Sequence, residues 1–342
     1  MTKSMWVAVT ILFLLFSACG VFMVLLQKDE EEKNIHYFLT RNRLNNSVSY
    51  QDLSLSVSDV AVLKNVSVRL QVLPGLANKT EEFVIHNYKE SGHIATKLSF
   101  SAENISFRLV DIARILKKSD ESVIDSLALF NPAADILNYP LYAVMLAGCN
   151  NVSAGVKGEY TYYPTAKKMM LSADISDKCL GRWNFDVSLN NISNAQQGQL
   201  ILAFKHLVQK GNPAADLKNF LEGAVITALS FSYTETALVK GYKRYIDTLY
   251  LRQPNAPSPA ELDNREIQKI VSYLSFSNAH RQRNADIAQT IAAFIKSPDK
   301  ISFQSKPGKE VPLRVLNGTF LRRITDLLLR LDTTVTLEKS TF

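Results

Sequence analysis

The sequence predicts an α+β protein: an N-terminal transmembrane helix, then antiparallel sheet covered by helices, with a mainly helical C-terminal part. Three observations lead to this prediction. An uncharged, almost wholly apolar run occupies residues 6–26. Segments in which apolar and polar residues alternate follow it, which is typical of half-buried antiparallel strands. In the last third of the chain most apolar residues recur instead at helical spacing.

The apolar run of residues 6–26 predicts a membrane anchor, because at about 1.5 Å per residue it spans a hydrocarbon core of roughly 30 Å. A buried helix of a soluble protein and a cleaved secretory signal are the alternatives. Ser17-Ala18-Cys19-Gly20 is similar to part of a lipoprotein box, but Phe16 departs from that pattern and the run stays apolar after Cys19. We therefore predict an uncleaved anchor in the bacterial inner membrane, with residues 1–5 cytoplasmic and the bulk periplasmic.

Composition indicates a folded protein, since 46% of the residues are hydrophobic and 21% are charged. The net charge of +7 is spread along the chain, and no five Lys or Arg residues occur in a row. This charge would suit an anionic surface, but diffuse surface charge explains it better. Nucleic acid is not an expected partner, because the predicted compartment excludes it.

Two cysteines lie outside the predicted anchor, Cys149 and Cys179. One disulfide between them is therefore the only intramolecular pairing open to them, and it would fit an oxidising compartment. Two unrelated buried thiols are the alternative.

The predicted elements divide the chain after the anchor into a polar stalk at residues 27–46, a β-rich domain at 47–194 and a mainly helical α+β part at 195–342 packed on it. The β-rich domain has strands near residues 53–57, 66–72, 83–85 and 98–107, a helical insert over 109–147 and a three-stranded meander over 154–192. In the last part we expect helices at 198–208, 214–222, 236–251, 259–274, 281–295 and 320–331, and strands at 226–233, 300–304 and 333–337.

Sequence motifs for catalysis are absent: there is no phosphate loop, no dinucleotide fingerprint, no HExxH and no GxSxG. The five histidines are scattered, so we predict no metal site, no cofactor and no catalytic residue. Five carboxylates fall on predicted strands, where solvent-facing positions explain them better than paired catalysis. They are Asp52, Asp59, Glu159, Asp174 and Asp186.

A basic and aromatic group on one predicted helix is the most suggestive chemical feature. It consists of Lys240, Tyr242, Lys243, Arg244 and Tyr245. Such residues suit a membrane surface, where an apolar ring and a cationic group meet the lipid headgroups. An ordinary amphipathic helix with a basic outer face is the alternative.

Seven Asn-x-Ser/Thr sequons occur, which in a eukaryotic secreted protein would be acceptors for N-linked sugars. Their asparagines are Asn45, Asn65, Asn78, Asn104, Asn151, Asn191 and Asn317.

Two segments resemble known families. VSYQDL at residues 48–53 with NVSV at 65–68 looks like the opening of AsmA-like envelope proteins of Gram-negative bacteria. FIKSP at 294–298 and LDTTV at 331–335 resemble the YdgA-like group of anchored proteobacterial proteins. The resemblance implies a periplasmic location and involvement with the envelope or its lipids, and it transfers no catalytic residue.

These observations predict a non-enzymatic, inner-membrane-anchored periplasmic protein that binds a lipid or an envelope partner, besides the bilayer around residues 6–26. Its sheet would offer an apolar concave face and its helices a cover. A periplasmic hydrolase acting on envelope polymers is one alternative. A eukaryotic glycosylated type II membrane protein is the other.

Overall fold

The structure is a computed structural model that describes the strands and two long helices of the chain. The described residues are 48–55, 61–69, 77–91, 94–108, 149–208, 219–220, 222–241, 243–244, 258, 261, 264–265, 268, 281–306, 308–315 and 326–339. The predicted tail at 1–5, the anchor at 6–26, the stalk at 27–46 and the helical insert at 109–147 lie outside them.

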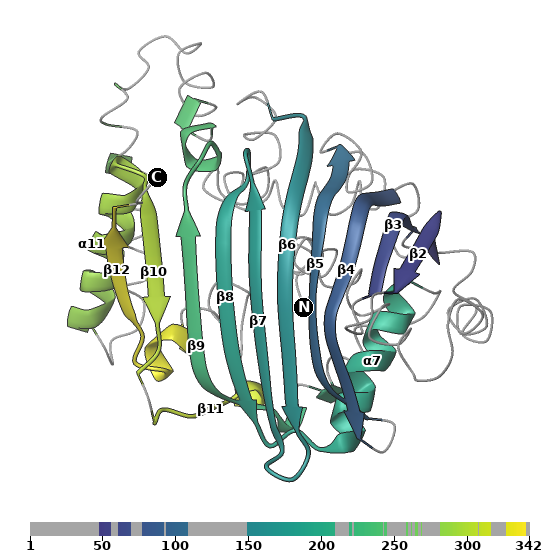
Figure 1. Cartoon of the computed structure of the whole chain (residues 1–342). Helices are drawn as coiled ribbons and strands as arrows, with labels where there is room; N and C mark the ends of the chain where they lie inside the picture. The colour runs from purple at the N-terminus through teal and green to yellow at the C-terminus, as the bar shows by residue number, and fades with distance from the viewer. Residues whose placement is uncertain are drawn as a thin grey trace, which may run out of the picture.

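One 12-stranded antiparallel sheet organises the described residues (Figure 1). The strands follow the order β1-β3-β4-β5-β6-β7-β8-β9-β10-β12, with β2 paired to β3 and β11 paired to β9. Because this order is nearly that of the sequence, most neighbours are antiparallel strands that follow one another along the chain. The strands are β1 Val48–Ser49, β2 Asp52–Leu55, β3 Ala61–Arg69, β4 Ala77–Ser91, β5 Ile94–Arg108, β6 Asn151–Tyr163, β7 Lys168–Asp177, β8 Gly181–Asn190, β9 Val225–Thr234, β10 Lys300–Gln304, β11 Val311–Pro312 and β12 Thr334–Glu338.

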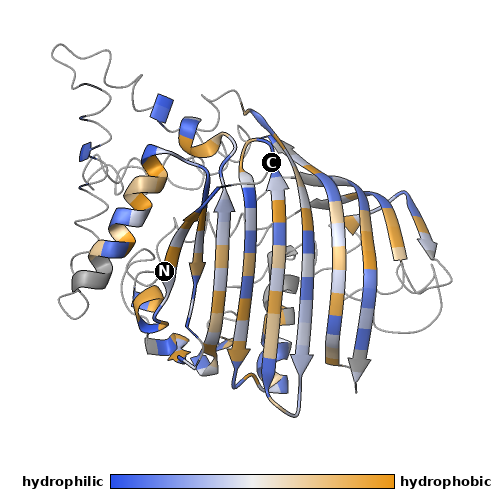
Figure 2. Cartoon of the chain, turned by 60° about the vertical axis from the view of Figure 1, so that its left-hand side comes forward, coloured by the Kyte–Doolittle hydropathy of each residue, from blue (hydrophilic) through white to orange (hydrophobic). Residues whose placement is uncertain are grey.

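The sheet has one apolar face and one polar face, and β6 shows both. Val152, Val156 and Tyr160 are buried, whereas Lys157 and Glu159 between them are exposed. Hydrophobic and hydrophilic bands alternate along the strands in the same way in Figure 2. This is the period of two expected of a strand with one side in the core. We name the apolar side the covered face and the polar side the open face.

The core lies on the covered face. The rings of Phe83 on β4 and Phe100 on β5 are stacked, with centroids 5.6 Å apart. Gly158 on β6 lies opposite Phe100, and a Cβ at that position would overlap the phenyl ring. The buried hydroxyl of Tyr160 donates a hydrogen bond to the carbonyl of Ala95 at 3.2 Å, and burial raises the pKa of Tyr160 well above its usual value. The Phe100 ring thus occupies the space that a side chain at residue 158 would need, and only glycine fits there.

Helix α7, Asn194–Val208, starts directly after β8. Ser193 and Gln196 form a reciprocal cap: Gln196 Oε1 accepts from Ser193 N and Oγ at 2.9 Å, and Ser193 Oγ accepts from Gln196 N at 3.3 Å. Tyr162 of β6 donates to the carbonyl of Ile192 and to Asn194 Oδ1, at 3.0 and 2.8 Å. These bonds fix the start of the helix to the covered face.

Helix α11, Arg281–Lys296, precedes β10. Its inward side chains are Ile287, Ala288 and Phe294, all buried. Phe294 meets the ring of Tyr233 on β9 edge-on, with centroids 5.9 Å apart. The Tyr233 hydroxyl in turn donates to Glu235 Oε2 at 2.5 Å. Burial, and then this carboxylate, raise the pKa of Tyr233 well above its usual value.

Several predicted elements are confirmed. The meander expected over 154–192 is β6, β7 and β8, and the predicted strands at 226–233, 300–304 and 333–337 are β9, β10 and β12. The predicted helix at 281–295 is α11, and the one at 198–208 is α7, which begins four residues earlier because of its cap at Ser193.

The predicted α+β class, with helix-covered sheets and a mainly helical C-terminal part, is wrong. The described residues are mostly one antiparallel sheet, and helix is the smaller element. The physical reason is strand pairing between distant segments. β9 pairs with β8 and β10 pairs with β9, so the last third of the chain continues the sheet of the predicted β-rich domain beyond its predicted end at residue 194. Helical spacing between those strands in the sequence concealed this continuity.

The predicted transmembrane signal-anchor and the predicted single-pass location in the inner membrane are also corrected, because they gain no support. No helix in the part of the chain that the structure describes is long and apolar enough to cross a bilayer. The prediction relied on an apolar run alone, and residues 6–26 lie outside the described part.

Candidate functional site

Strand register lines up polar side chains in one row across the open face. Glu159 on β6 lies opposite Ser172 on β7, and Ser172 lies opposite Asp186 on β8. Because neighbouring strands are about 4.8 Å apart, the backbones of Glu159 and Asp186 are about 9.6 Å apart. We name this the groove row. From β5 to β10 it consists of Ser99, Glu159, Ser172, Asp186, Ser230 and Gln304.

A groove of about 460 Å³ lies along this row, over β6 to β10. Besides the row, hydroxyl groups and one ammonium group line it, among them Thr161, Ser188 and Lys168. Met170, 41% exposed, adds an apolar patch two residues from Ser172 on the same face of β7. The groove therefore offers donors, acceptors and a small apolar surface within one concave site.

One wall of the groove comes from Gln304 at the end of β10 and from Ser305 and Gly308 in the segment that follows. Ser305 is 8% exposed, and its Oγ accepts a hydrogen bond from Leu229 N at 2.8 Å. The Ser305 amide donates to the carbonyl of Leu229, also at 2.8 Å. This wall is therefore held to β9 by two hydrogen bonds rather than attached as a loose loop.

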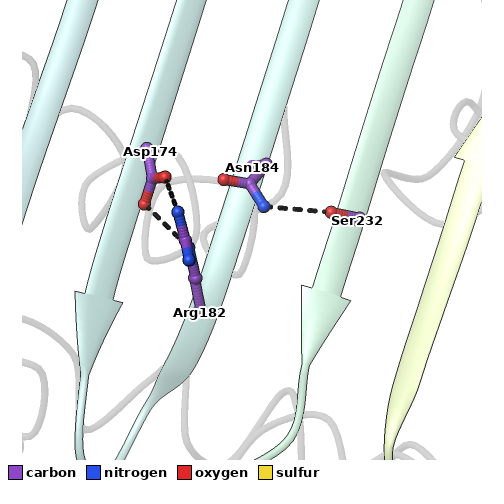
Figure 3. Close-up of polar contacts among 4 residues, drawn as sticks. All are labelled: Asp174, Arg182, Asn184 and Ser232. Atoms are coloured by element: carbon purple, nitrogen blue, oxygen red, sulfur yellow. Dashed lines mark hydrogen bonds and ion pairs between the residues drawn. The ribbon is translucent and has the colours of Figure 1, made fainter. Parts of the chain in front are cut away.

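In the next row of the open face, Asp174, Asn184 and Ser232 are paired within the protein (Figure 3). Arg182 Nε and Nη2 donate to Asp174 at 3.3 and 2.5 Å. The hydrogen bond and the negative charge of Asp174 raise the pKa of Arg182 above its usual value. Asn184 Nδ2 donates to Ser232 Oγ at 3.2 Å. The polar groups of these four side chains form cross-strand contacts, which stabilise the sheet.

The groove row differs in this respect. Within the described part of the chain, the side chains of Glu159, Ser172, Asp186 and Ser230 form no hydrogen bond or ion pair. Glu159 and Asp186 are both exposed. Two carboxylates and a set of hydroxyls are thus available to a molecule that enters the groove.

Metal chemistry has no visible support in the described residues, because no three His, Cys, Asp or Glu side chains there are grouped to hold an ion. The row instead has the composition of a hydrogen-bonding surface. Hydroxyls both donate and accept, and carboxylates accept from hydroxyl or ammonium groups.

Cys149 and Cys179, the two cysteines of the predicted bond, are joined by a disulfide, with Cα atoms 5.6 Å apart. Cys149 precedes β6 and Cys179 lies in the turn after β7. The start of β6 pairs with the end of β7, so both cysteines lie at the same end of the sheet. Asp177 organises the turn: its carboxylate accepts from the amides of Cys179 and Leu180, each at 2.7 Å, and from Ser153 N at 2.9 Å.

Three of the predicted membrane-surface residues, Lys240, Lys243 and Arg244, lie in the first turns of the helix that follows β9. Lys240 and Arg244 are exposed and Lys243 is half-buried, whereas Tyr242 and Tyr245 lie outside the described residues. Glu235 caps this helix by accepting from the amide of Lys240 at 3.3 Å. Lys240, Lys243 and Arg244 do not line the groove, and the contact of the five residues with a membrane stays a prediction.

The sequence identified Glu159 and Asp186 as strand carboxylates but missed the serines beside them. Ser172, Ser188 and Ser230 alternate with apolar residues, so their face could be read from the sequence. Their arrangement as neighbours depends on strand register, which the sequence pattern does not give.

The open face with its groove is therefore the candidate site. Comparison with known proteins adds no function to it: no protein-family model matches this chain, and no curated protein matches it.

Proposed function

We propose that this protein is a non-enzymatic binding protein and that its groove holds a hydroxyl-rich component of a cell envelope. One observation carries the proposal: the groove row presents carboxylates and hydroxyls without partners in the described part of the chain, while Asp174, Asn184 and Ser232 of the neighbouring row are paired. The envelope as the source of the ligand is supported by the resemblance to AsmA-like and YdgA-like proteins alone.

A polar ligand fits this sheet better than a lipid tail does. Large apolar side chains of the described strands, such as Phe83, Phe100 and Tyr160, are buried in the core, and Met170 adds only a small apolar patch to the groove. Transfer of a hydrocarbon chain to the open face would cover Glu159 and Asp186 with apolar atoms, which costs free energy unless their charges are paired. A headgroup or a saccharide instead supplies partners for these groups.

Hydrolysis of an envelope polymer is the second candidate, and Glu159 and Asp186 favour it. Inverting glycosidases hold two carboxylates about 6.5–9.5 Å apart, and the strand spacing puts these two backbones about 9.6 Å apart. A general acid is usually protected from water, however, and both side chains are exposed. Binding without reaction is therefore our first choice.

Calorimetric titration with soluble envelope oligosaccharides tests the proposal. In a Ser172→Val, Ser230→Val variant two groove hydroxyls are replaced by methyl groups, while valine keeps the strand conformation. If both hydroxyls bind the ligand, at about 0.5–1.5 kcal/mol per hydrogen bond, affinity should fall about tenfold. Chromatography of the incubated oligosaccharides detects any cleavage.

Thr336→Val is the matched control, since Thr336 lies on the open face of β12 and outside the groove. Its affinity should equal that of the unchanged protein. An equal loss in the control, or no loss in the double variant, contradicts binding in the groove. Cleavage that is lost on Glu159→Gln or Asp186→Asn replaces the first candidate by the second.

A further inference from the structure

We propose that the ligand of the groove is a saccharide polymer that carries amino groups, lying across the strands along the groove row. This inference rests on the proposed function. It goes beyond that function by naming the chemistry that the groove selects, and it starts from the charges that have no protein partner.

The uncommitted charge within the groove is mainly negative. Glu159 and Asp186 line it, with Lys168 as the single cationic side chain among the described lining residues. Arg182, two residues from Asn184 on β8, is paired with Asp174, so its charge is largely offset. Lys157 lies opposite Asp174 in the neighbouring row and does not line the groove. Ammonium groups therefore meet two free carboxylates on the floor of the groove.

The net charge of the chain, +7, has the opposite sign, but distance decides which effect prevails. At physiological ionic strength, charges more than about 8 Å apart in water are largely screened. An ammonium group beside Glu159 or Asp186 is within hydrogen-bonding range of one carboxylate, whereas the positive charge of the protein is spread along the whole chain. The local charge therefore determines which ligand is preferred.

Spacing is the second part of the argument. The two carboxylates alternate with serines, and Ser172 separates them, so a repeat of two strands is about 9.6 Å long. In a β-1,4-linked polymer each ring is turned over relative to the one before it, so like groups return to the same edge at every second ring. A two-ring unit of such a polymer has a length close to this repeat, with hydroxyls left to meet Ser172 and Ser230.

An apolar patch completes the site. Met170 is 41% exposed and lies in the groove beside the row. Sugar rings have one face made of C–H groups, which can pack against the apolar and adaptable side chain of Met170. Charge, hydroxyls and this patch together fit a sugar ring better than a polyamine, which has neither hydroxyls nor a ring face.

Titration of the full chain with glucosamine hexamer tests this inference, at a pH below neutrality where the amines are charged. The N-acetylated hexamer of equal length is the comparison ligand. The free amine form should bind more tightly. Glu159→Gln and Asp186→Asn should each weaken its binding about three- to fivefold, as expected for exposed ion pairs, and leave the acetylated form unchanged.

Glu103→Gln is the matched control, because Glu103 on β5 is exposed and does not line the groove. It removes the same charge and should not change either affinity. Circular dichroism checks that each variant is folded.

The outcomes separate the two proposals. Equal affinity for both hexamers, with loss in the Ser172→Val, Ser230→Val variant, overturns the preference for amines and keeps the proposed function. Binding to vesicles with amine headgroups, but to neither hexamer, overturns the polymer as ligand. Binding to no oligosaccharide and no vesicle overturns both proposals.

Discussion

Removal of the Cys149–Cys179 disulfide is expected to lower the free energy of unfolding by about 3.6 kcal/mol. The bond closes a loop of 30 residues that contains β6 and β7. In the chain-entropy treatment such a loop restricts the unfolded chain by about 12 cal/mol/K, which corresponds to about 3.6 kcal/mol at 25 °C.

The folded turn should change little, because Asp177 still accepts hydrogen bonds from the amides of Cys179 and Leu180. The loss should therefore come from the unfolded chain, and binding in the groove should persist after reduction. This expectation separates the entropic effect of the bond from a local structural role.

Urea unfolding followed by the fluorescence of Trp183 measures the effect. Trp183 lies on β8, and its Nε1 donates to the carbonyl of Leu180 beside the disulfide at 2.8 Å. The second tryptophan, Trp6, is replaced by phenylalanine so that one residue reports. A Cys149→Ser, Cys179→Ser variant should unfold like the reduced protein and not respond to reductant. A difference below about 1 kcal/mol between oxidised and reduced protein would refute the chain-entropy reasoning.

Three further predictions concern the fold. Gly158→Ala should destabilise the protein by about 1–3 kcal/mol in chemical denaturation, because the added methyl group overlaps the Phe100 ring. Gly198→Ala in α7, where the space around the Cβ is open, should stabilise it by up to about 1 kcal/mol. No change of stability in Gly158→Ala contradicts the close approach of the ring. The raised pKa of Tyr233 means that the folded state keeps a proton that the unfolded state releases, so the free energy of unfolding should fall above about pH 10. Tyr233→Phe should reduce that fall by about 1.4 kcal/mol per pH unit. An unchanged slope in the variant contradicts the burial effect. Asn104 has a φ of 54°, so Asn104→Ala should lower the free energy of unfolding by about 1–2 kcal/mol, and Asn104→Gly should lower it less. Equal losses of stability in thermal melts would assign the role to the asparagine side chain instead of the backbone.

Strands joined by short turns could be predicted, and long strands with irregular pairing could not. β6, β7 and β8 are consecutive, and apart from Met170 on the open face of β7 they keep an alternation that the sequence displays. β4 and β5 are 15 residues each, but the sequence predicted only 83–85 and 98–107. Register shifts at Ile85/Asn87 and Lys89/Glu90 change which side chains face the core, so the alternation fails in the sequence although pairing continues.

The sequons show how a motif can have a structural explanation. Asn65, Asn104 and Asn191 each have a positive φ, a conformation that asparagine tolerates better than most residues. Their side-chain amides are also engaged: Asn191 Nδ2, for example, donates to the carbonyl of Gly223 at 2.9 Å. Three of the seven asparagines are thus accounted for by turns and irregular strand positions, without a role for sugar.

The candidate site could be predicted only in part, for a reason of chain topology. The face of each side chain follows from alternation, and this placed Glu159 and Asp186 at polar positions. Which residues become neighbours depends on register, and Ser230 and Gln304 meet although helix α11 lies between them in the sequence. Such pairing is decided by the whole sheet and not by a local pattern.

The contrast between the two polar rows bears on what the open face is for. Directly opposed partners across strands, such as Asn184 with Ser232, contribute roughly 0.2–1 kcal/mol per pair to a sheet. The groove row forgoes this contribution, because a serine separates its two carboxylates and neither faces a cation of the same row. A sheet selected for stability alone would gain from a lysine at Ser172, between two acids. The absence of that residue leaves the carboxylates free for a ligand, and Ser172→Lys should therefore raise stability while it blocks the groove.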